Sequence, residues 1–115
     1  MAGDFIFKLR QYGADVDDAM ERFLDDEELY KTCLDAFLTD PNFEQLDLAV
    51  KANDAQGAFA AGHALKGVAG NLSLKPIYDM LCDQVDELRG GSTDNLEGNY
   101  VALMAEVDRL KREVY

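Results

Sequence analysis

The chain has 115 residues, about the size of a single domain, and 48% of them are hydrophobic, enough to form a core. Its 11 basic and 23 acidic residues give a net charge of −12. Such a charge disfavours binding to nucleic acids and to anionic membrane surfaces, because both attract Lys and Arg. Solubility alone is a second explanation of the acidity. We expect one domain over residues 1–115, with neither nucleic acid nor membrane as a partner.

The sequence also lacks the marks of membrane insertion, secretion and structural metal binding. No run of about 18 apolar residues is present, and the first ten residues do not have the pattern of a signal peptide. Cys33 and Cys82 have no CxxC spacing, and the chain has a single His. These features disfavour a disulfide framework and a zinc site. We therefore expect a cytoplasmic protein with two reduced thiols.

Apolar residues recur at spacings of three and four along the whole chain, which predicts helices and no strands. A short helix is expected over about residues 4–11, with Gly13 after its end. Asp15 can cap a second short helix, and a longer one follows over about residues 26–38. Asp40 and Pro41 then have the order of an N-cap and a first helical residue. The helix that they start should reach about Asn53.

The second half of the chain predicts two more helices and then a last one. Asp54 is the candidate cap of a helix that ends at about Leu72 or Leu74. Pro76 starts the next helix. Gly90-Gly91 ends it, because glycine readily adopts the left-handed conformation at a helix C-terminus.

The last helix should be capped by Thr93 or Asp94. Its apolar residues alternate steps of four and three, and they are Leu96, Tyr100, Leu103, Val107, Leu110 and Val114. This spacing suits antiparallel packing in a bundle. The expected fold class is all-α, an up-and-down four-helix bundle with short additional helices at the N-terminus.

The predicted helix from Asp54 onward has two contrasting sides. At about 100° per residue, one side carries the expected core residues Ala58, Ala61, Leu65, Val68 and Leu72. The opposite side carries Gln56, Phe59, Ala60, His63, Lys66, Gly67 and Gly70. A solvated helix face normally carries long charged residues, whereas this one carries one His, one Lys and small neighbours. The outer side is therefore the candidate functional surface.

Glycine in a helix interior costs about 1 kcal/mol relative to alanine, and this segment has several. They are Gly57, Gly62, Gly67 and Gly70. Gly67 follows His63 by one turn on the same face, so it should leave the imidazole uncovered, and Gly70 should extend the uncovered strip. Lys66, three residues after His63, can reach back alongside the ring.

This arrangement suits phosphorylation of His63. An exposed imidazole is largely neutral at neutral pH, and its neutral ring nitrogen is a nucleophile that needs no strong base. A nearby ammonium stabilises the dianionic phosphoryl group. Two simpler explanations stay open: a lone helical His is often an incidental surface residue, and glycines can serve close helix packing. Neither explains why His, Lys and Gly share one face opposite an intact core stripe.

The segment from His63 to Leu72 reads HALKGVAGNL and resembles the signature of histidine-containing phosphotransfer (HPt) domains, His-x-Leu-Lys-Gly followed by small residues. The length, the helix order and the helix start at Pro41 also resemble that family across nearly the whole chain. The resemblance implies a four-helix bundle with the phosphorylated His exposed in mid-helix. It implies that His63 is the phosphorylation site, Lys66 its electrostatic partner and Gly67 the residue that leaves space.

The resemblance also implies a histidine phosphocarrier in a two-component phosphorelay, which exchanges its phosphoryl group with the aspartate of a response-regulator receiver domain. The chain has no glycine-rich nucleotide loop, so we expect a carrier and not an enzyme, with catalysis supplied largely by its partners. The resemblance implies a sensor histidine kinase or hybrid kinase among these partners. We expect no metal and no cofactor on this chain, Mg²⁺ in the receiver, and a monomer. The expected partner-binding face comprises Gln56, Phe59, Ala60, Ala64 and Gly70.

Two other functions are considered beside phosphotransfer. The first is a helical adaptor in which His63 is never phosphorylated; acid-labile phosphate on His63 would distinguish the carrier from it. The second is a small enzyme with His63 as general base. Its candidate carboxylates, Asp54 and Asp79, lie two or more turns away along the sequence, and no GxSxG or similar motif accompanies them.

Overall fold

The computed structural model describes residues 2–115, and side-chain environments from residue 4 onward. All regular structure in that range is helical, which confirms the predicted all-α class. The seven helices are α1 (Ala2–Tyr12), α2 (Val16–Arg22), α3 (Glu27–Leu38), α4 (Pro41–Lys51), α5 (Ala55–Asn71), α6 (Lys75–Arg89) and α7 (Leu96–Val114).

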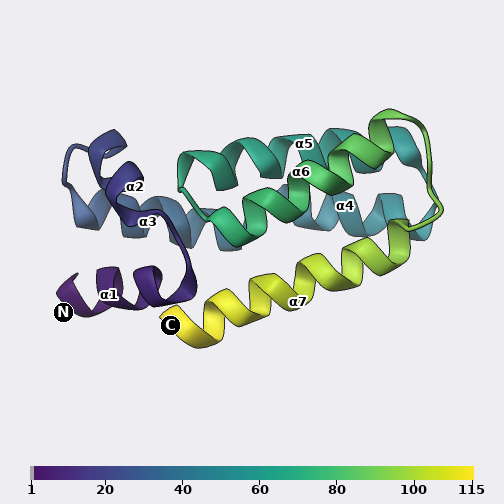
Figure 1. The fold of residues 1–115 in the computed structure, drawn as a ribbon. Coiled ribbons are helices and arrows are strands. Elements are labelled where there is room, and N and C mark those ends of the chain that lie inside the picture. Colours follow the sequence, from purple (N-terminus) through teal and green to yellow (C-terminus); the bar gives the residue numbers. More distant parts are fainter. Residues whose placement is uncertain (1) are drawn as a thin grey trace.

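Helices α4 to α7 form an antiparallel bundle in which α5 packs against both α4 and α6 (Figure 1). The three N-terminal helices lie at one end of this bundle, where α1 packs against α7 and α3 runs on into α4. The N- and C-terminal ends of the chain lie near each other at that end. The molecule is elongated, with extents of 42 × 24 × 20 Å. The predicted bundle with short additional N-terminal helices is therefore correct.

Four helices begin at an aspartate whose carboxylate accepts a hydrogen bond from a backbone amide of the first turn. These caps are Asp15, Asp26, Asp40 and Asp54, with N···O distances of 2.8–3.2 Å. An N-cap side chain satisfies an amide that would otherwise have no partner in the helix. The sequence therefore predicts these four helix starts correctly.

The predicted cap of the last helix is wrong. Helix α7 begins at Leu96 after Asn95, and no side chain caps it. Thr93 contributes its backbone carbonyl instead, which accepts a hydrogen bond from the Leu96 amide at 3.2 Å. The Asn95 side chain is directed to α6, where its Nδ2 donates to Glu87 Oε2 at 3.3 Å.

Helix α5 ends at Asn71, slightly earlier than predicted, because Ser73 adopts a left-handed conformation with φ 54°. The turn is closed by the Leu74 amide, which donates to the Ala69 carbonyl at 3.0 Å. Ser73 is buried, and its hydroxyl donates to Asp18 Oδ2 at 2.7 Å. Its carbonyl accepts from the Asp15 amide at 2.9 Å. These bonds attach α2 to the turn between α5 and α6.

The core runs through all seven helices. Of the core residues predicted for α5 and its C-terminal end, four are buried, namely Ala58, Ala61, Leu65 and Leu72. Val68, also predicted there, is half-buried, and Ala69 is fully buried instead. Near the C-terminal end of α5, the buried face is therefore centred on Ala69 and not on Val68 as predicted.

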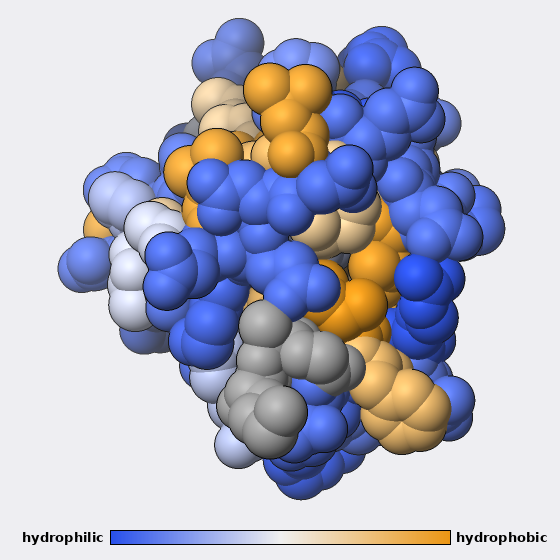
Figure 2. All heavy atoms as spheres, turned by 90° about the vertical axis from the view of Figure 1, so that its left-hand side faces the viewer, coloured by the Kyte–Doolittle hydropathy of each residue, from blue (hydrophilic) through white to orange (hydrophobic). Residues whose placement is uncertain are grey.

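The surface is mostly hydrophilic, as Figure 2 shows for the end formed by the N-terminal helices, where a few hydrophobic residues interrupt it. The largest exposed apolar side chains of α1 and the α2–α3 connection are Phe7 and Leu24. Within residues 2–115, no helix combines the length and the apolar character needed to cross a membrane. Cys33 and Cys82 are free and half-buried, as expected.

Tyr30 provides a test of the link between α3 and the α5–α6 turn. It is fully buried, and its hydroxyl donates to the Leu72 carbonyl at 2.6 Å. Tyr30→Phe leaves that carbonyl without its partner, so the free energy of unfolding should fall by about 1–2 kcal/mol. Tyr78→Phe is the matched control, because Tyr78 lies exposed on α6. Equal denaturant midpoints for the two variants would contradict the role of this bond.

Candidate functional site

His63 occupies the middle of α5 and faces solvent. It is the ninth of the seventeen residues from Ala55 to Asn71. The buried side of the helix, with Ala58, Ala61 and Leu65, fixes the rotation of α5 and so directs His63 outward. The predicted exposure of this residue is therefore confirmed.

Helix α5 has no acidic residue, although 23 of the 115 residues of the chain are acidic. Lys66 is its only basic residue, and it is half-buried. The salt bridges found among residues 4–115 do not involve Lys66, whereas Lys51 and Lys75 each pair with an aspartate. The ammonium group of Lys66 thus takes part in none of these ion pairs.

Gly67 leaves open space one turn after His63. A Cβ atom placed on Gly67 would have nothing within 4 Å, and the residue is exposed. The structure therefore contains no packing contact that requires glycine at this position. Because Gly67 has no side chain, the surface of the helix next to His63 is left uncovered.

The other three glycines of α5 lie against neighbouring groups. A Cβ on Gly62 would lie 3.2 Å from Val85 Cγ2 of α6, and one on Gly57 would meet the carboxylate of the Asp54 cap. Gly70 was expected to extend the uncovered strip, but this is wrong, because a Cβ there would lie 3.0 Å from the Tyr78 ring. The packing explanation thus applies to these three glycines and not to Gly67.

The imidazole of His63 stacks on the ring of Phe59, one turn earlier on the same helix. The ring centroids are 5.7 Å apart and the planes differ by 8°. The Arg89 guanidinium, from the end of α6, lies over the Phe59 ring with its Cζ 5.6 Å from the centroid. The sequence pattern placed Phe59 and His63 on one face but did not predict the stack or Arg89. The i, i+4 spacing could have indicated the first of these.

An open cleft of about 450 Å³ begins at Lys66 and Gly67, one turn after His63, and extends toward the C-terminus of α5. It is lined by Lys66, Gly67, Gly70 and Asn71 of α5, by Ser73, by Lys75 and Tyr78 of α6, and by Asp15 and Asp18. The pKa of Asp18 lies below its ordinary value because the Ser73 hydroxyl and the Arg22 guanidinium donate hydrogen bonds to its carboxylate. The wall that α2 contributes is therefore charged and held in place.

A second hollow, of about 270 Å³, lies on the other side of His63, toward the N-terminus of α5. Its lining is largely apolar and comprises Ala55, Gln56, Phe59, Leu88, Arg89 and Gly91. His63 thus stands between two depressions of the surface, one polar and one apolar. Such a surface can receive a partner's side chains on both sides of the imidazole.

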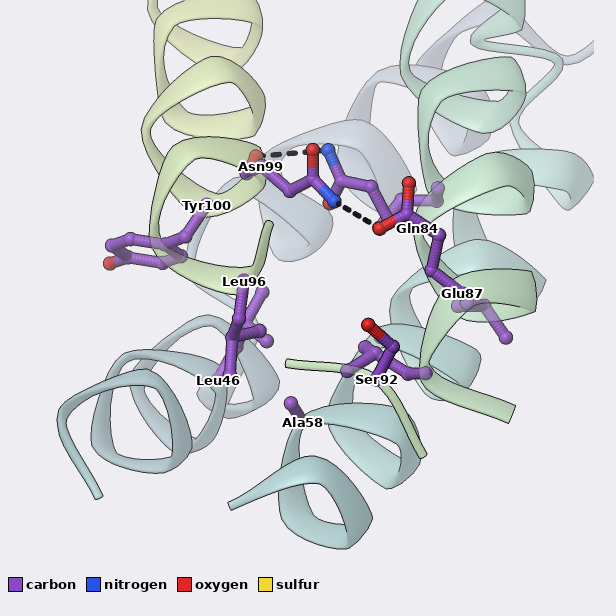
Figure 3. Close-up of a pocket in the computed structure, with 12 residues that line it drawn as sticks. Leu46, Ala58, Gln84, Glu87, Ser92, Leu96, Asn99 and Tyr100 are labelled. Atoms are coloured by element: carbon purple, nitrogen blue, oxygen red, sulfur yellow. Dashed lines mark hydrogen bonds between the residues drawn. The ribbon is translucent and has the colours of Figure 1, made fainter. Parts of the chain in front are cut away.

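A third cavity lies inside the bundle and is not part of this surface. Figure 3 shows it among α4, α5, α6 and α7, where Gln84 donates to the Asn99 carbonyl at 2.9 Å. Its free volume is about 10 Å³, room for about one water molecule. It touches α5 at Ala58 and Gly62, on the inward side of the helix.

The predicted partner-binding residues all lie on the side of α5 that carries His63. Gln56 and Ala60 are exposed, whereas Phe59, Ala64 and Gly70 are half-buried. No group of three or more His, Cys, Asp or Glu side chains that could hold a metal ion occurs among the described residues.

The two carboxylates considered for an enzyme are engaged elsewhere. Asp54 caps the first turn of α5, about 13 Å along the helix axis from His63 at 1.5 Å per residue. Asp79 pairs with Lys75 on α6 at 3.5 Å. The structure thus brings no carboxylate from either predicted position to the imidazole as an orienting group.

The sequence was compared with protein-family models, with curated proteins and with solved structures. The family model described as Hpt domain matches residues 28–113, which are 86 of the 115 residues. Neither the search of curated proteins nor the search of solved structures found a match. The matched segment runs from the start of α3 to the end of α7 and includes His63, Lys66 and Gly67. The chain belongs to the Hpt domain family.

Proposed function

We propose that this chain is a histidine phosphocarrier that accepts a phosphoryl group on His63 and exchanges it with the aspartate of a response-regulator receiver domain. Membership of the Hpt family implies histidine phosphotransfer in a phosphorelay. The observation that carries the residue assignment is the exposed His63 in mid-helix, with open space above Gly67. It is the only His in the sequence.

The transfer needs little chemistry from this chain. The unprotonated ring nitrogen of His63 attacks the phosphorus atom of the receiver's aspartyl phosphate, so that a P–N bond forms while the P–O bond breaks. The bonding electrons stay on oxygen and restore the aspartate carboxylate, and the ring becomes cationic because its other nitrogen keeps its hydrogen. Lys66 supports the dianionic phosphoryl group on the ring by electrostatic attraction. The reverse sequence returns the group to a receiver.

The proposed partners are a receiver domain and a sensor histidine kinase or hybrid kinase. The receiver would bring the Mg²⁺, and this chain would bind no cofactor of its own. The partner-binding face would centre on His63 and include Gln56, Phe59, Ala60 and Ala64, because small or apolar exposed groups are easily desolvated. Gly70 would contribute at its edge, beside Tyr78. We expect the 115 residues to act as one domain, as a monomer, in the cytoplasm.

Phosphorylation of the chain should depend entirely on His63. After incubation with a phosphorylated receiver domain or a cognate kinase, the protein should carry phosphate that is labile in acid and stable in base. His63→Gln should carry none, because the chain has no second imidazole. A label of the same chemical character on His63→Gln would refute the assignment. Absence of any label on the wild type would instead favour the adaptor function.

Gly67→Gln should impair transfer without impairing the fold. The new side chain would stand one turn from the imidazole, where it obstructs the approach of a receiver. Glutamine has a better helix propensity than glycine by somewhat under about 1 kcal/mol, so thermal stability should be unchanged or slightly higher. The measurements are the thermal midpoint and the rate of phosphotransfer from a labelled receiver.

Gly98→Gln provides the matched control for that substitution. Gly98 is also an exposed helical glycine, on α7, and a Cβ atom added there would have nothing within 4 Å. The variant should show the same change in thermal midpoint with normal transfer. Equal transfer rates for the two variants would show that the space above Gly67 has no part in partner approach.

Lys66→Ala should slow transfer without abolishing it. The substitution leaves the approach to His63 open but removes the positive charge beside the phosphoryl group. A charge at a partly exposed site is worth on the order of 1 kcal/mol, which corresponds to a rate reduction of about fivefold. Lys111→Ala, on the exposed side of α7, is the control. An unchanged rate for Lys66→Ala, measured at low ionic strength, would exclude the electrostatic role.

A further inference from the structure

Phe59 contacts His63 within the chain itself, in addition to lying on the proposed partner-binding face. The two rings are nearly parallel, with planes 8° apart and centroids 5.7 Å apart. Phe59 is itself half-buried, so its ring is supported by the protein on one side. The imidazole therefore lies against a partly fixed surface, although it is exposed.

A chain of contacts from α6 holds Phe59 in turn. The Arg89 guanidinium lies over the Phe59 ring at 5.6 Å, and an ion pair to Asp86, with a 2.7 Å Nη1–Oδ1 distance, restrains Arg89. The side chain of Arg89 also helps to line the apolar hollow beside Phe59. Cations over aromatic faces are attracted by the ring quadrupole. The position of the Phe59 ring thus depends on α6 as well as on α5.

Stacking restrains an imidazole in a way that leaves it reactive. The lone pair of the unprotonated ring nitrogen lies in the ring plane, so the orientation of that plane sets the direction from which phosphorus can be attacked. A hydrogen bond would occupy one of the two nitrogens, whereas a parallel stack occupies neither. No side-chain hydrogen bond to His63 is found among residues 4–115; the bonds nearest to it along α5 involve the Gly57 amide and the Asn71 carbonyl.

We infer that Phe59 is a positioning residue for phosphotransfer, which holds the plane of the His63 imidazole in one orientation through a stack that Arg89 supports from α6. The inference rests on the proposed phosphocarrier function. It assigns Phe59 a role within the free protein, beyond any contact with the receiver. Side chains at positions i and i+4 of a helix are neighbours on its surface, so the four-residue spacing brings the two rings within reach of the stack.

The size of the effect follows from the conformers that the stack excludes. On a helix the His side chain has two common χ1 rotamers, and the ring has about two orientations around χ2. Without the stack, the productive conformer would fall to about one in four, so the rate of transfer within the complex should fall about fourfold. The affinity for the receiver should change much less, since the apolar bulk of residue 59 can be kept.

The experiment compares Phe59→Leu, which keeps an apolar side chain, with Phe59→Tyr, which keeps the aromatic face. A panel of receiver domains is phosphorylated with acetyl phosphate, and the receiver that transfers fastest to the wild type is used. Transfer is measured against receiver concentration, which separates the maximal rate from the half-saturating concentration. Phe59→Leu should lower the maximal rate about fourfold, Phe59→Tyr should restore it, and Arg89→Gln should give a smaller reduction. A raised half-saturating concentration with an unchanged maximal rate would overturn the inference, because Phe59 would then be a partner contact only.

Nuclear magnetic resonance of the free protein tests the same inference without any partner. Nuclear Overhauser effects should connect the ring protons of His63 and Phe59, and the χ1 couplings of His63 should show one rotamer in the wild type and in Phe59→Tyr. The couplings should become averaged in Phe59→Leu. Averaged couplings already in the wild type would overturn the inference. If phosphoramidate labels the wild type but no receiver does, the proposed function is refuted. The spectra would still decide whether the stack exists, so the two failures can be distinguished.

Discussion

Helix α5 approaches α6 closely because Gly62 has no side chain, and a Cβ at that position would lie 3.2 Å from Val85 Cγ2. The alanines at positions 58, 61 and 69 are buried on the same side of the helix. Small residues allow helix axes to come near each other, and close packing then fixes the rotation of the helix about its own axis. Because α5 cannot rotate, the residues on its outer side have a defined direction.

The outer side of α5 then carries the features that the proposed chemistry needs. The chain is strongly acidic, but α5 has no acidic residue and Lys66 is its one charged residue. The helix itself therefore carries a positive charge. This surface is hollowed by a polar cleft on one side of His63 and by an apolar hollow on the other. The imidazole lies between them with open space above Gly67 and a stacked ring beside it. The surface thus combines access for a partner with restraint of the nucleophile.

Local sequence patterns predicted the helices and the position of His63, since each pattern acts within a turn or two. An aspartate before an apolar run caps a helix through its own backbone neighbours, as Asp15 and Asp54 do. The spacing of apolar residues likewise places His63 opposite the core. The resemblance to HPt domains rests on the segment from His63 to Leu72 together with the length, the helix order and the helix start at Pro41, and the family match includes that segment.

Contacts between helices are what the sequence did not reveal. Tyr78 lies against Gly70, Arg89 lies over Phe59, and the Asn95 amide is drawn to Glu87 instead of capping α7. Each of these depends on how far one helix is rotated and shifted against another, which no local spacing encodes. The prediction that Val68 and not Ala69 is buried failed for a related reason. The apolar face of a helix is broad, so the sequence alone does not decide which of two adjacent apolar residues points into the core.

If this chain carries a phosphoryl group between proteins, a phosphoryl group on His63 must be able to leave it again for a receiver domain. Protein labelled on His63 is purified from its donor and mixed with an unphosphorylated receiver domain and Mg²⁺. We expect the acid-labile label to leave this chain and an equal amount of base-labile acyl phosphate to appear on the receiver. If the label stays on His63 and every receiver of the panel remains unlabelled, this chain is not a phosphocarrier for these receivers and the proposed function is wrong.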